Sequence, residues 1–426
     1  MNPMILALIL FALTYVLMLV FQKYRPIIAL TSAVIFIVTG MMPLGEALSN
    51  MDSWNVLLMI AGTMGTVALM IESKMPALLA DLLIEKVPNV KWAVVMLSLF
   101  AGIVSAFIDN VATVLMIAPI ALAIAKKFDI NPVGMIIAIA VSSNLQGAAT
   151  LVGDTTSIML GQAANMDFLD FFVFNGKPGI FFAVELGALI SAIILLFLFR
   201  KETDKVQPGE RTKVTNYVPT VLMLLTVALL IGASVFPSKP AITNGVICCV
   251  IMVIGVIYDC IRRKSFKAAL DTLKEIDYRT ILLLFGLFIV VGGIEAQGVV
   301  KAIADVFQKV SGGNLFVVYT IVVWMSVILS AFIDNIPYTA TMLPVMASIA
   351  ANMGADPIVL YFGLLSGATL GGNLTPIGAS ANITGIGILR KEGYEVKNSD
   401  FLKIGIPFTF AAVIPAYIYI WLFYGA

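Results

Sequence analysis

The chain has no histidine among its 426 residues, and only 12% of them are charged. Without imidazole, proton relays and metal sites based on histidine are excluded, so any proton coupling has to use carboxylates. Soluble domains carry about 25% charged residues. Here 60% of the residues are hydrophobic, which predicts an all-α polytopic membrane protein. The three cysteines Cys248, Cys249 and Cys260 lie in or beside one apolar segment, so we interpret them as core residues rather than a disulfide frame or metal set. The net charge of +1 gives no reason to expect a nucleic-acid partner.

Long apolar segments predict about ten membrane-spanning helices. They cover residues 4–21, 26–43, 54–71, 132–160, 179–199, 216–235, 241–259, 280–297, 357–388 and 401–424. No basic region precedes the first segment and no small-residue cleavage site follows it, so we interpret it as a span and not as a signal peptide.

The hexapeptide Ser-Ala-Phe-Ile-Asp-Asn occurs twice, at 105–110 and at 330–335. The offset of 225 residues holds without a gap from Asp52 and Asp277 onwards. The other matching pairs are Pro119 and Pro344, Pro132 and Pro357, Gly147 and Gly372, Thr150 and Thr375, Gly153 and Gly378, and Ile158 and Ile383. This predicts two half-molecules, residues 1–210 and 211–426, as many secondary transporters are built.

Both hexapeptides interrupt apolar regions, 92–127 and 315–351, which we interpret as re-entrant hairpins with Asp-Asn at their tips. Each half then has five crossings and one hairpin, and an odd number of crossings predicts that the second half is inverted relative to the first. With this topology 22 of the 26 basic residues fall on one side, which is therefore the cytoplasmic side of the cell membrane, with both termini outside. Three amphipathic stretches, 73–88, 261–279 and 298–311, are expected to lie at the membrane interface.

Four polar segments are expected to meet near the middle of the membrane: the two hairpin tips and the two glycine-broken helices at 132–160 and 357–388. A carboxylate in hydrocarbon costs several kcal/mol and so needs a role. A glycine-rich break frees carbonyls, which suit a hard cation such as sodium, and helix N-termini, which suit an anion. The candidate ion- or substrate-binding residues are Asp109, Asn110, Thr113, Asn144, Thr150, Gly153, Asp154, Asp334, Asn335, Asn373, Thr375, Gly378, Ser380 and Asn382.

Simpler roles remain open for several of these residues. Asp109 and Asp334 are also good N-caps for the second arm of each hairpin. The glycines also allow close helix packing, and Thr113 could bond to its own helix. Glu185, within a span, is as suited to pairing as to function. Asp154 has no acidic counterpart, because Ala379 occupies the matching place, so the two halves are not expected to bind equally.

The segments SAFIDNVATVLMIAPI, NLQGAATLVGDTTSI, SAFIDNIPYTATMLPV and GGNLTPIGASANITGI resemble the ion transporter superfamily. The resemblance covers nearly the whole chain and lies in the branch of arsenite pumps, D-type sodium/proton antiporters and the melanosomal P protein. It implies a homodimer in which the hairpins and broken helices form a mobile transport domain that moves like an elevator against a scaffold. It also implies sodium sites at Asp109, Asn110 and Gly153 and at Asp334, Asn335 and Gly378. Gln146, Asp154-Thr155-Thr156-Ser157 and Asn373-Leu374-Thr375 depart from the pattern and leave the substrate open.

The predicted function is a secondary transporter coupled to sodium or protons, and the acidic tips favour cation/proton antiport. Alternatives are a carrier of a small di- or tricarboxylate and an exporter of arsenite or antimonite. An intramembrane aspartyl protease is a remote alternative, because Leu151 and Val152 precede Gly153-Asp154 where that chemistry uses Gly-x-Gly-Asp. A channel is disfavoured, because no polar stripe runs along whole helices. No phosphate-binding GxxxxGK[ST] segment is present, and no cofactor other than bound sodium is expected, although a separate ATPase partner stays open.

Overall fold

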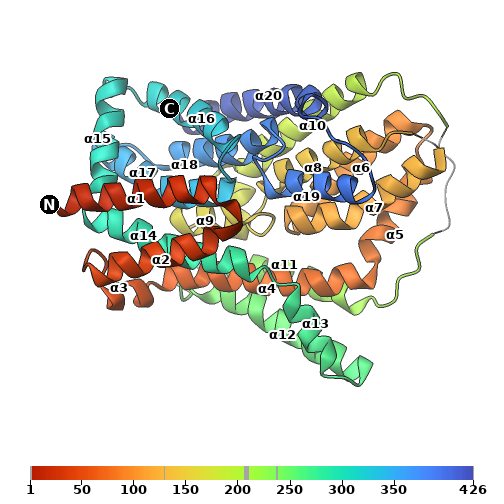
Figure 1. Ribbon diagram of the computed structural model, residues 1–426, viewed down its shortest axis with the longest axis horizontal. Coiled ribbons are helices and arrows are strands. Elements are labelled where there is room, and N and C mark those ends of the chain that lie inside the picture. The colour runs from red at the N-terminus through yellow and green to blue at the C-terminus, as the bar shows by residue number, and fades with distance from the viewer. Residues whose placement is uncertain (1, 129, 206–210, 237, 426) are drawn as a thin grey trace.

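The computed structural model describes residues 2–128, 130–205, 211–236 and 238–425, which form twenty α-helices and one pair of short strands (Figure 1). The first ten helices are α1 (Pro3–Val20), α2 (Arg25–Val38), α3 (Leu44–Ser49), α4 (Met51–Ser73), α5 (Met75–Ile84), α6 (Val90–Ser105), α7 (Asn110–Phe128), α8 (Val133–Gly147), α9 (Thr155–Ala163) and α10 (Ile180–Leu198). The others are α11 (Val218–Ser234), α12 (Thr243–Arg263), α13 (Lys267–Lys274), α14 (Tyr278–Ala296), α15 (Val299–Ser311), α16 (Leu315–Ser330), α17 (Asn335–Met353), α18 (Ile358–Leu365), α19 (Ser380–Lys391) and α20 (Asn398–Tyr424).

The all-α, multi-pass prediction is confirmed. Within the described residues, seven helices are long and apolar enough to cross a membrane: α1, α4, α7, α10, α12, α14 and α20. Since α7 is a hairpin arm and several predicted spans are shorter helices, the count of ten crossings stays a prediction. The predicted span at 26–43 is too long, because α2 ends at Val38 and Gly40 then takes a left-handed backbone (φ +72°) that stops a helix.

Each hairpin forms from two helices that meet at an Asp-Asn tip. Asn89 accepts a hydrogen bond from Trp92 N–H and starts α6, and Asn314 does the same for α16 through Phe316 and Val317. These caps are 225 residues apart, as are the helix ends at the tips. The sequence therefore places the hairpin boundaries in both halves by the same local chemistry.

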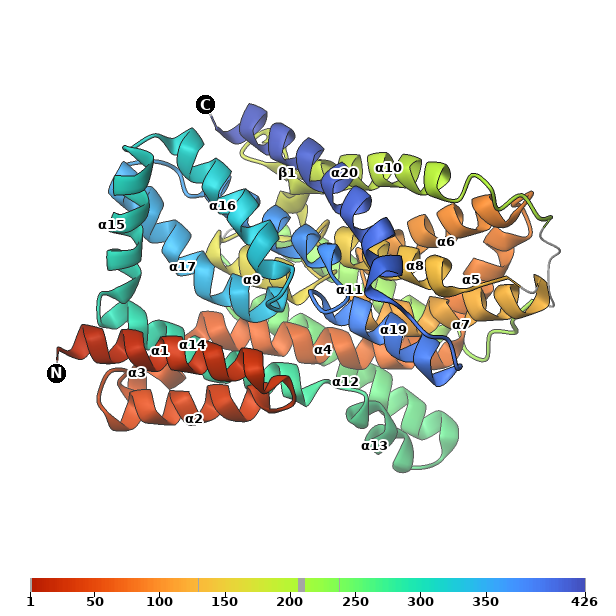
Figure 2. The same cartoon turned by 45° about the horizontal axis from the view of Figure 1, so that its top comes forward.

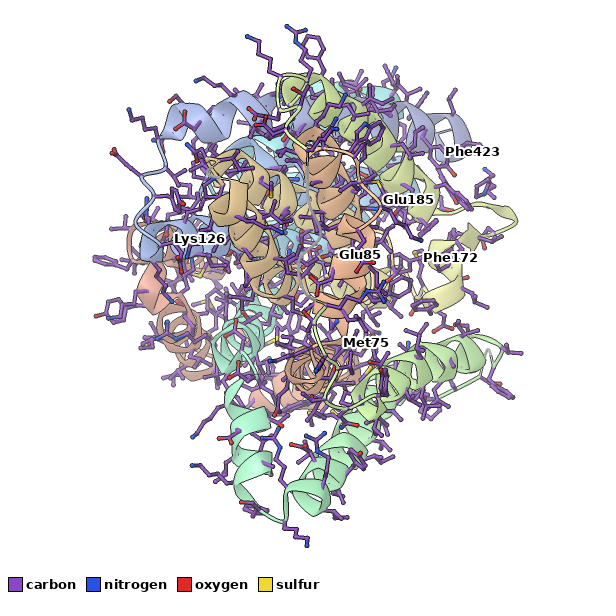
Figure 3. All side chains as sticks on the ribbon, turned by 90° about the vertical axis from the view of Figure 1, so that its right-hand side faces the viewer. Met75, Glu85, Lys126, Phe172, Glu185 and Phe423 are labelled. Atoms are coloured by element: carbon purple, nitrogen blue, oxygen red, sulfur yellow. The ribbon has the colours of Figure 1, made fainter. Side chains whose placement is uncertain are left out.

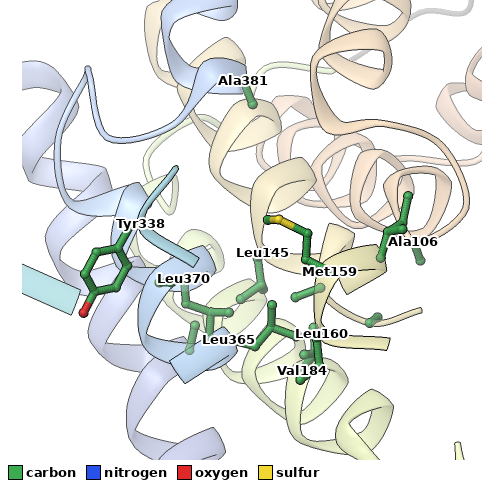
Figure 4. Packing of buried hydrophobic residues seen from close by; sticks show 14 of the residues in the cluster. Ala106, Leu145, Met159, Leu160, Val184, Tyr338, Leu365, Leu370 and Ala381 are labelled. Atoms are coloured by element: carbon green, nitrogen blue, oxygen red, sulfur yellow. The ribbon is translucent and has the colours of Figure 1, made fainter. Parts of the chain in front are cut away.

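Both predicted helix breaks are present but differ in form. The first separates α8 from α9, with Gly147 and Thr155 on either side. The second runs from α18 through a π-helix, η3 (Ser366–Leu370), and a 3₁₀ turn, η4 (Gly372–Leu374), before α19 begins at Ser380. Figure 4 shows Leu145 beside Leu365 and Leu370 in the buried core between the two broken helices.

The two connecting helices α5 and α15 lie at opposite ends of the molecule in both Figure 1 and Figure 2. Each follows an equivalent long helix, α4 or α14, and leads into a hairpin. Inverted halves predict this placement, but the inversion and the split into transport domain and scaffold stay predictions. Both chain termini lie towards the α15 end, while Figure 3 looks at the α5 end, with Met75 and Glu85 of α5 and Lys126 of α7 in view.

Three local features were not predicted. The 3₁₀ turns η1 (Gln22–Tyr24) and η2 (Phe168–Phe171) join helices, and β1 (Val173–Phe174) pairs with β2 (Lys177–Pro178). The strand turn places Asn175 and Gly176 at φ +51° and +74°, so the Asn-Gly pair was a readable hairpin signal. The three cysteines are free, and Cys248 is a buried core residue, as predicted.

Candidate functional site

Each hairpin tip presents an aspartate that caps the helix that follows. Asp109 Oδ1 accepts hydrogen bonds from the N–H groups of Val111 (3.0 Å) and Ala112 (3.1 Å). Asp334 Oδ1 accepts one from Ile336 N–H (3.1 Å). The capping role is therefore real in both halves and uses one oxygen of each carboxylate. Oδ2 takes no part in the cap: that of Asp109 has no hydrogen bond within the described residues, while that of Asp334 is bound by other side chains described below.

The helix breaks lie directly against the tips. Gly153 is within 2.6–2.7 Å, measured from where a Cβ would stand, of the carbonyl oxygens of Gly147, Ser105 and Ala106. Gly378 has the same neighbours at the 225-residue offset, at 2.5–3.0 Å. Only glycine fits such a position, so the carbonyl groups of tip and break are brought together by the lack of a side chain.

One threonine fastens each break to its tip. The Thr150 hydroxyl donates to Ala106 O, and the Thr375 hydroxyl donates to Ala331 O. Asn382 Nδ2 donates to the carbonyl groups of Gly372 and Thr375, both at 3.1 Å, and its counterpart Ser157 donates to Gly147 O at 3.3 Å. Thr150, Thr375 and Asn382 therefore hold the backbone in place and do not line the cavity described below.

A network of asparagines joins the two halves at the centre. Asn110 Nδ2 donates to Asn144 Oδ1 (3.1 Å), and Asn144 Nδ2 donates to Asn373 Oδ1 (3.0 Å) and to Thr369 O (2.7 Å). Asn373 Nδ2 returns to Val141 O (2.9 Å). The three asparagines are buried, so these bonds fix the first tip against both broken helices.

The halves also meet at Asp154. Its Oδ2 accepts hydrogen bonds from the Thr156 hydroxyl (2.7 Å) and from Asn335 Nδ2 (3.4 Å), and Thr156 lies 3.1 Å from the Thr369 hydroxyl. The carboxylate of the first break is therefore bound to the tip of the second hairpin. Ala379, at the matching place in the second half, cannot make such bonds, while unequal binding by the two halves stays a prediction.

A cavity of about 140 Å³ opens where these groups converge. Five predicted site residues line it: Asp109, Asn110, Asp154, Asn335 and Ser380. Glu275 and Asp277, at the start of α14, and Met64, Val67, Ala68 and Ile71, in the second half of α4, complete much of its wall. The cavity thus carries four carboxylates, and its lining includes no lysine or arginine.

Asp277 and Glu275 were not predicted as site residues. The signal was present, because Asp277 is the counterpart of Asp52 in the repeat. Thr113 was predicted as a binding residue, but it does not line this cavity, and within the described chain its buried hydroxyl has no hydrogen-bond partner. Among the described residues, no three or more aspartate, glutamate or cysteine side chains are arranged to hold a metal ion.

Comparison with known proteins gives a family. The family model described as "Citrate transporter" matches residues 13–367. The chain belongs to the citrate transporter family. An uncharacterized transporter of Mycobacterium tuberculosis is 29% identical over 99% of this chain and 98% of its own length. A 46 kDa membrane protein of Mycobacterium leprae is 32% identical over 77% of this chain and 76% of its own.

More distant relatives also match this chain. The human P protein is 25% identical over 74% of this chain and 47% of its own length. The crystal structure of the YdaH transporter of Alcanivorax borkumensis has the same fold, with a TM-score of 0.59 at 15% identity, and the match covers 99% of this chain and 98% of that chain. The predicted superfamily resemblance is confirmed, and this citrate transporter family member is a multi-pass membrane transporter.

Other contacts in this family member were not foreseen. Arg25 forms a partly buried ion pair with Asp334: its Nη1 lies 3.1 Å from Asp334 Oδ2. Ser380 donates to the same oxygen at 3.3 Å. The α1–α2 connection therefore folds onto the second hairpin tip, while the side of the membrane on which Arg25 lies stays a prediction.

Glu185 has a pairing role. Gln146 Nε2 donates to both of its oxygens, at 3.0 and 2.8 Å. Gln146 stands where the superfamily usually has glycine, and Gly102 of the first hairpin leaves room for its carboxamide group. This departure from the pattern therefore binds α8 to α10 and does not reach the cavity.

The first half of α4 forms a second polar contact, away from the cavity. Gln162 Nε2 donates to Asp52 (2.9 Å), and Asn55 donates to Gln162 Oε1 (2.7 Å). These bonds hold the end of α9 against α4. In the second half, Asp277 faces the cavity, and Gly387 stands at the place matching Gln162.

Proposed function

We propose that this protein is a secondary transporter that exchanges a monovalent cation for protons. The observation that carries the proposal is the cavity, which presents Asp109, Asp154, Glu275 and Asp277 with no basic side chain in its lining. Asp154 is buried and Asp109 half-buried, while Glu275 and Asp277 are exposed. A buried carboxylate needs a cation or a proton, and exchange of one for the other is antiport.

Oxygen groups around the first tip suit sodium in particular. Carbonyl groups of tip and break converge at Gly153, and Asp109 keeps one carboxylate oxygen free of its capping bonds. Hard cations take oxygen ligands of this kind. The sodium site proposed for the first half therefore includes Asp109, Asn110 and Gly153, with Asp154 added by the fold.

A second candidate is a cation-coupled carrier of a small carboxylate. Five helix N-termini border the cavity, those of α7, α9, α14, α17 and α19, and Asp277 caps that of α14. Asp109 and Asp334 cap two of them, but no side chain caps α9 or α19. Free N–H groups and a hydroxyl at Ser380 would attract an anion once a cation had neutralised the acids. The relatives' family name supports this alternative, and arsenite would compete for the same place.

The transport cycle that we propose is an elevator-like movement of the hairpins and broken helices in a homodimer of the cell membrane. The dense hydrogen bonding of both tips to both breaks supports their moving as one body. A protease is disfavoured, since Asp334 is engaged by Arg25 and not free to pair with a second acid.

The test uses purified protein in liposomes with a pH-sensitive dye inside. A sodium or lithium gradient is expected to drive proton movement, whereas citrate, smaller dicarboxylates and arsenite added alone are not. Asp109→Asn is expected to lower sodium-driven flux by at least about tenfold, equivalent to about 1.4 kcal/mol of ion binding. Asp305→Asn, which changes a carboxylate of α15 outside the cavity, is the matched control.

Flux that depends on citrate and is unaffected by a pH gradient would favour the carboxylate carrier instead. Equal flux in wild type and Asp109→Asn would remove the first tip from the mechanism.

A further inference from the structure

The aspartate at the second hairpin tip is paired with an arginine from the start of α2. Arg25 Nη1 and Asp334 Oδ2 are 3.1 Å apart, and their side chains are only 14% and 10% exposed. Arg25 Nε also donates to Met18 O (3.3 Å), which orients the guanidinium group. The pair therefore joins the α1–α2 connection to the α17 tip.

A second contact, between α1 and α17, helps to hold Arg25 in its position beside Asp334. Tyr15 of α1 donates to Pro337 O at 2.6 Å, and its hydroxyl also contacts Thr341. Both partners lie in the first turns of α17, directly after Asp334. The arginine is thus built into the second site by two side-chain contacts from α1 and α2.

Nothing comparable exists at the first tip. Asp109 is the counterpart of Asp334, yet within the described residues it makes no ion pair. The described lining of the cavity around Asp109 also includes no arginine or lysine. Both tips have a capping aspartate, a glycine against their carbonyl groups and a threonine that fastens the break. Only at the second tip does a side chain of the protein neutralise the aspartate.

Arginine is suited to this role because its guanidinium group stays protonated in proteins. A partly buried carboxylate needs one neutralising charge, and a second cation beside the pair would be repelled and poorly solvated. Ser380 and Ile336 already satisfy the remaining contacts of Asp334. Both carboxylate oxygens of Asp334 are therefore engaged.

We propose that Arg25 is the resident counter-cation of the second tip and takes the place of a coupling ion there. An alkali ion then binds only on the side of Asp109 and Asp154, so one ion is bound per protomer. This inference rests on the proposed cation coupling, and it corrects the expectation of two sodium sites by assigning the second one to an arginine.

The experiment measures melting temperature in detergent against sodium concentration, with choline replacing sodium at constant ionic strength and at about pH 8, where free carboxylates are ionised. A ligand that binds only the folded protein stabilises it in proportion to the logarithm of its concentration, once per site. Wild type is expected to give the slope of one site. Arg25→Gln is expected to give about twice that slope, because Asp334 becomes available to sodium.

Three further variants complete the test. Arg25→Lys keeps a cation in place and is expected to keep the wild-type slope, and Arg25→Gln with Asp334→Asn is expected to return to it. Asp334→Asn alone is expected to melt at a lower temperature, because it leaves Arg25 unpaired, but with the slope of one site. This last variant decides the question even if Arg25→Gln does not fold.

The outcomes separate this inference from the proposed function. A wild-type melting temperature that does not depend on sodium would contradict the proposed coupling. The comparison of Arg25→Gln with the double variant would still test whether Arg25 takes the place of an ion. A wild-type slope in Arg25→Gln, or loss of the slope in Asp334→Asn, would overturn the assignment of Arg25 as the counter-cation.

Discussion

The contact of Gly153 with three carbonyl groups allows a sharp test of how the first helix break meets the first hairpin tip. In Gly153→Ala the new Cβ would lie 2.6 Å from Gly147 O and 2.7 Å from Ser105 O and Ala106 O. Reaching even 3.0 Å, the shortest spacing that Cβ atoms tolerate, requires each carbonyl group to withdraw by about 0.3–0.4 Å. All three are backbone groups, so no side-chain rotation relieves the contact.

Overpacking of a well-packed interior typically costs about 1–3 kcal/mol, and an all-backbone contact belongs at the upper end of that range, about 3 kcal/mol. We expect Gly153→Ala to melt several degrees below wild type in detergent. Because Asp154 follows directly and would be displaced with the break, we also expect sodium-driven flux in liposomes to fall by at least about tenfold, or about 1.4 kcal/mol.

Gly387→Ala is the matched control. It lies within α19, and a Cβ there would have no atom within 4 Å. Its helix should be unchanged or stabilised by up to about 1 kcal/mol, the usual gain of alanine over glycine. If Gly153→Ala melted and transported like Gly387→Ala, the close approach of tip and break would be wrong.

Three further variants test contacts outside the cavity. Gln146→Ala removes both hydrogen bonds to Glu185 and is expected to lower the free energy of unfolding by about 1–3 kcal/mol, the cost of an unsatisfied buried group. The same substitution should cost less in a protein that already carries Glu185→Gln. Equal losses in the two backgrounds would contradict the pairing. Tyr15→Phe removes the bond to Pro337 O and is expected to cost about 0.5–1.5 kcal/mol in a thermal melt, while Tyr278→Phe, an exposed residue, should cost nothing measurable. The Arg211 guanidinium holds the pKa of Glu85 below its ordinary value, so Arg211→Ala should melt below wild type at neutral pH. This difference in melting temperature should disappear as the pH falls through the lowered pKa, because Glu85 then becomes protonated. A difference that persisted in acid would assign the effect to packing instead.

Much of the fold could be predicted because local signals were strong and occurred twice. The Asp-Asn tips, the paired caps at Asn89 and Asn314, and the glycines of the breaks follow from short-range chemistry that a repeat makes easy to read. The break positions also brought Asp109, Asn110, Asp154, Asn335 and Ser380 into one cavity, as expected.

The missed features depend on contacts distant in sequence or on weak local signals. Arg25 stands beside Pro26 at a helix start and looks like an interfacial anchor, while its partner is 309 residues away. The π-helix at 366–370 is fully buried, and its sequence has no local pattern that predicts it. Thr113 was assigned to binding from its place near a tip, but the direction of its side chain is set by the turn of α7 and leads away from the cavity.

The bond between Gln162 and Asp52 has a consequence for the resting state of the protein. It fastens α9 to α4 at one end, and its counterpart would need a side chain at position 387, where there is only glycine. A hydrogen bond to a charged group contributes about 1.5–3 kcal/mol, and 1.4 kcal/mol is a tenfold ratio of populations. In the alternating cycle proposed above, this bond would favour the form in which the acidic cavity is bordered by α14, by about that ratio of populations.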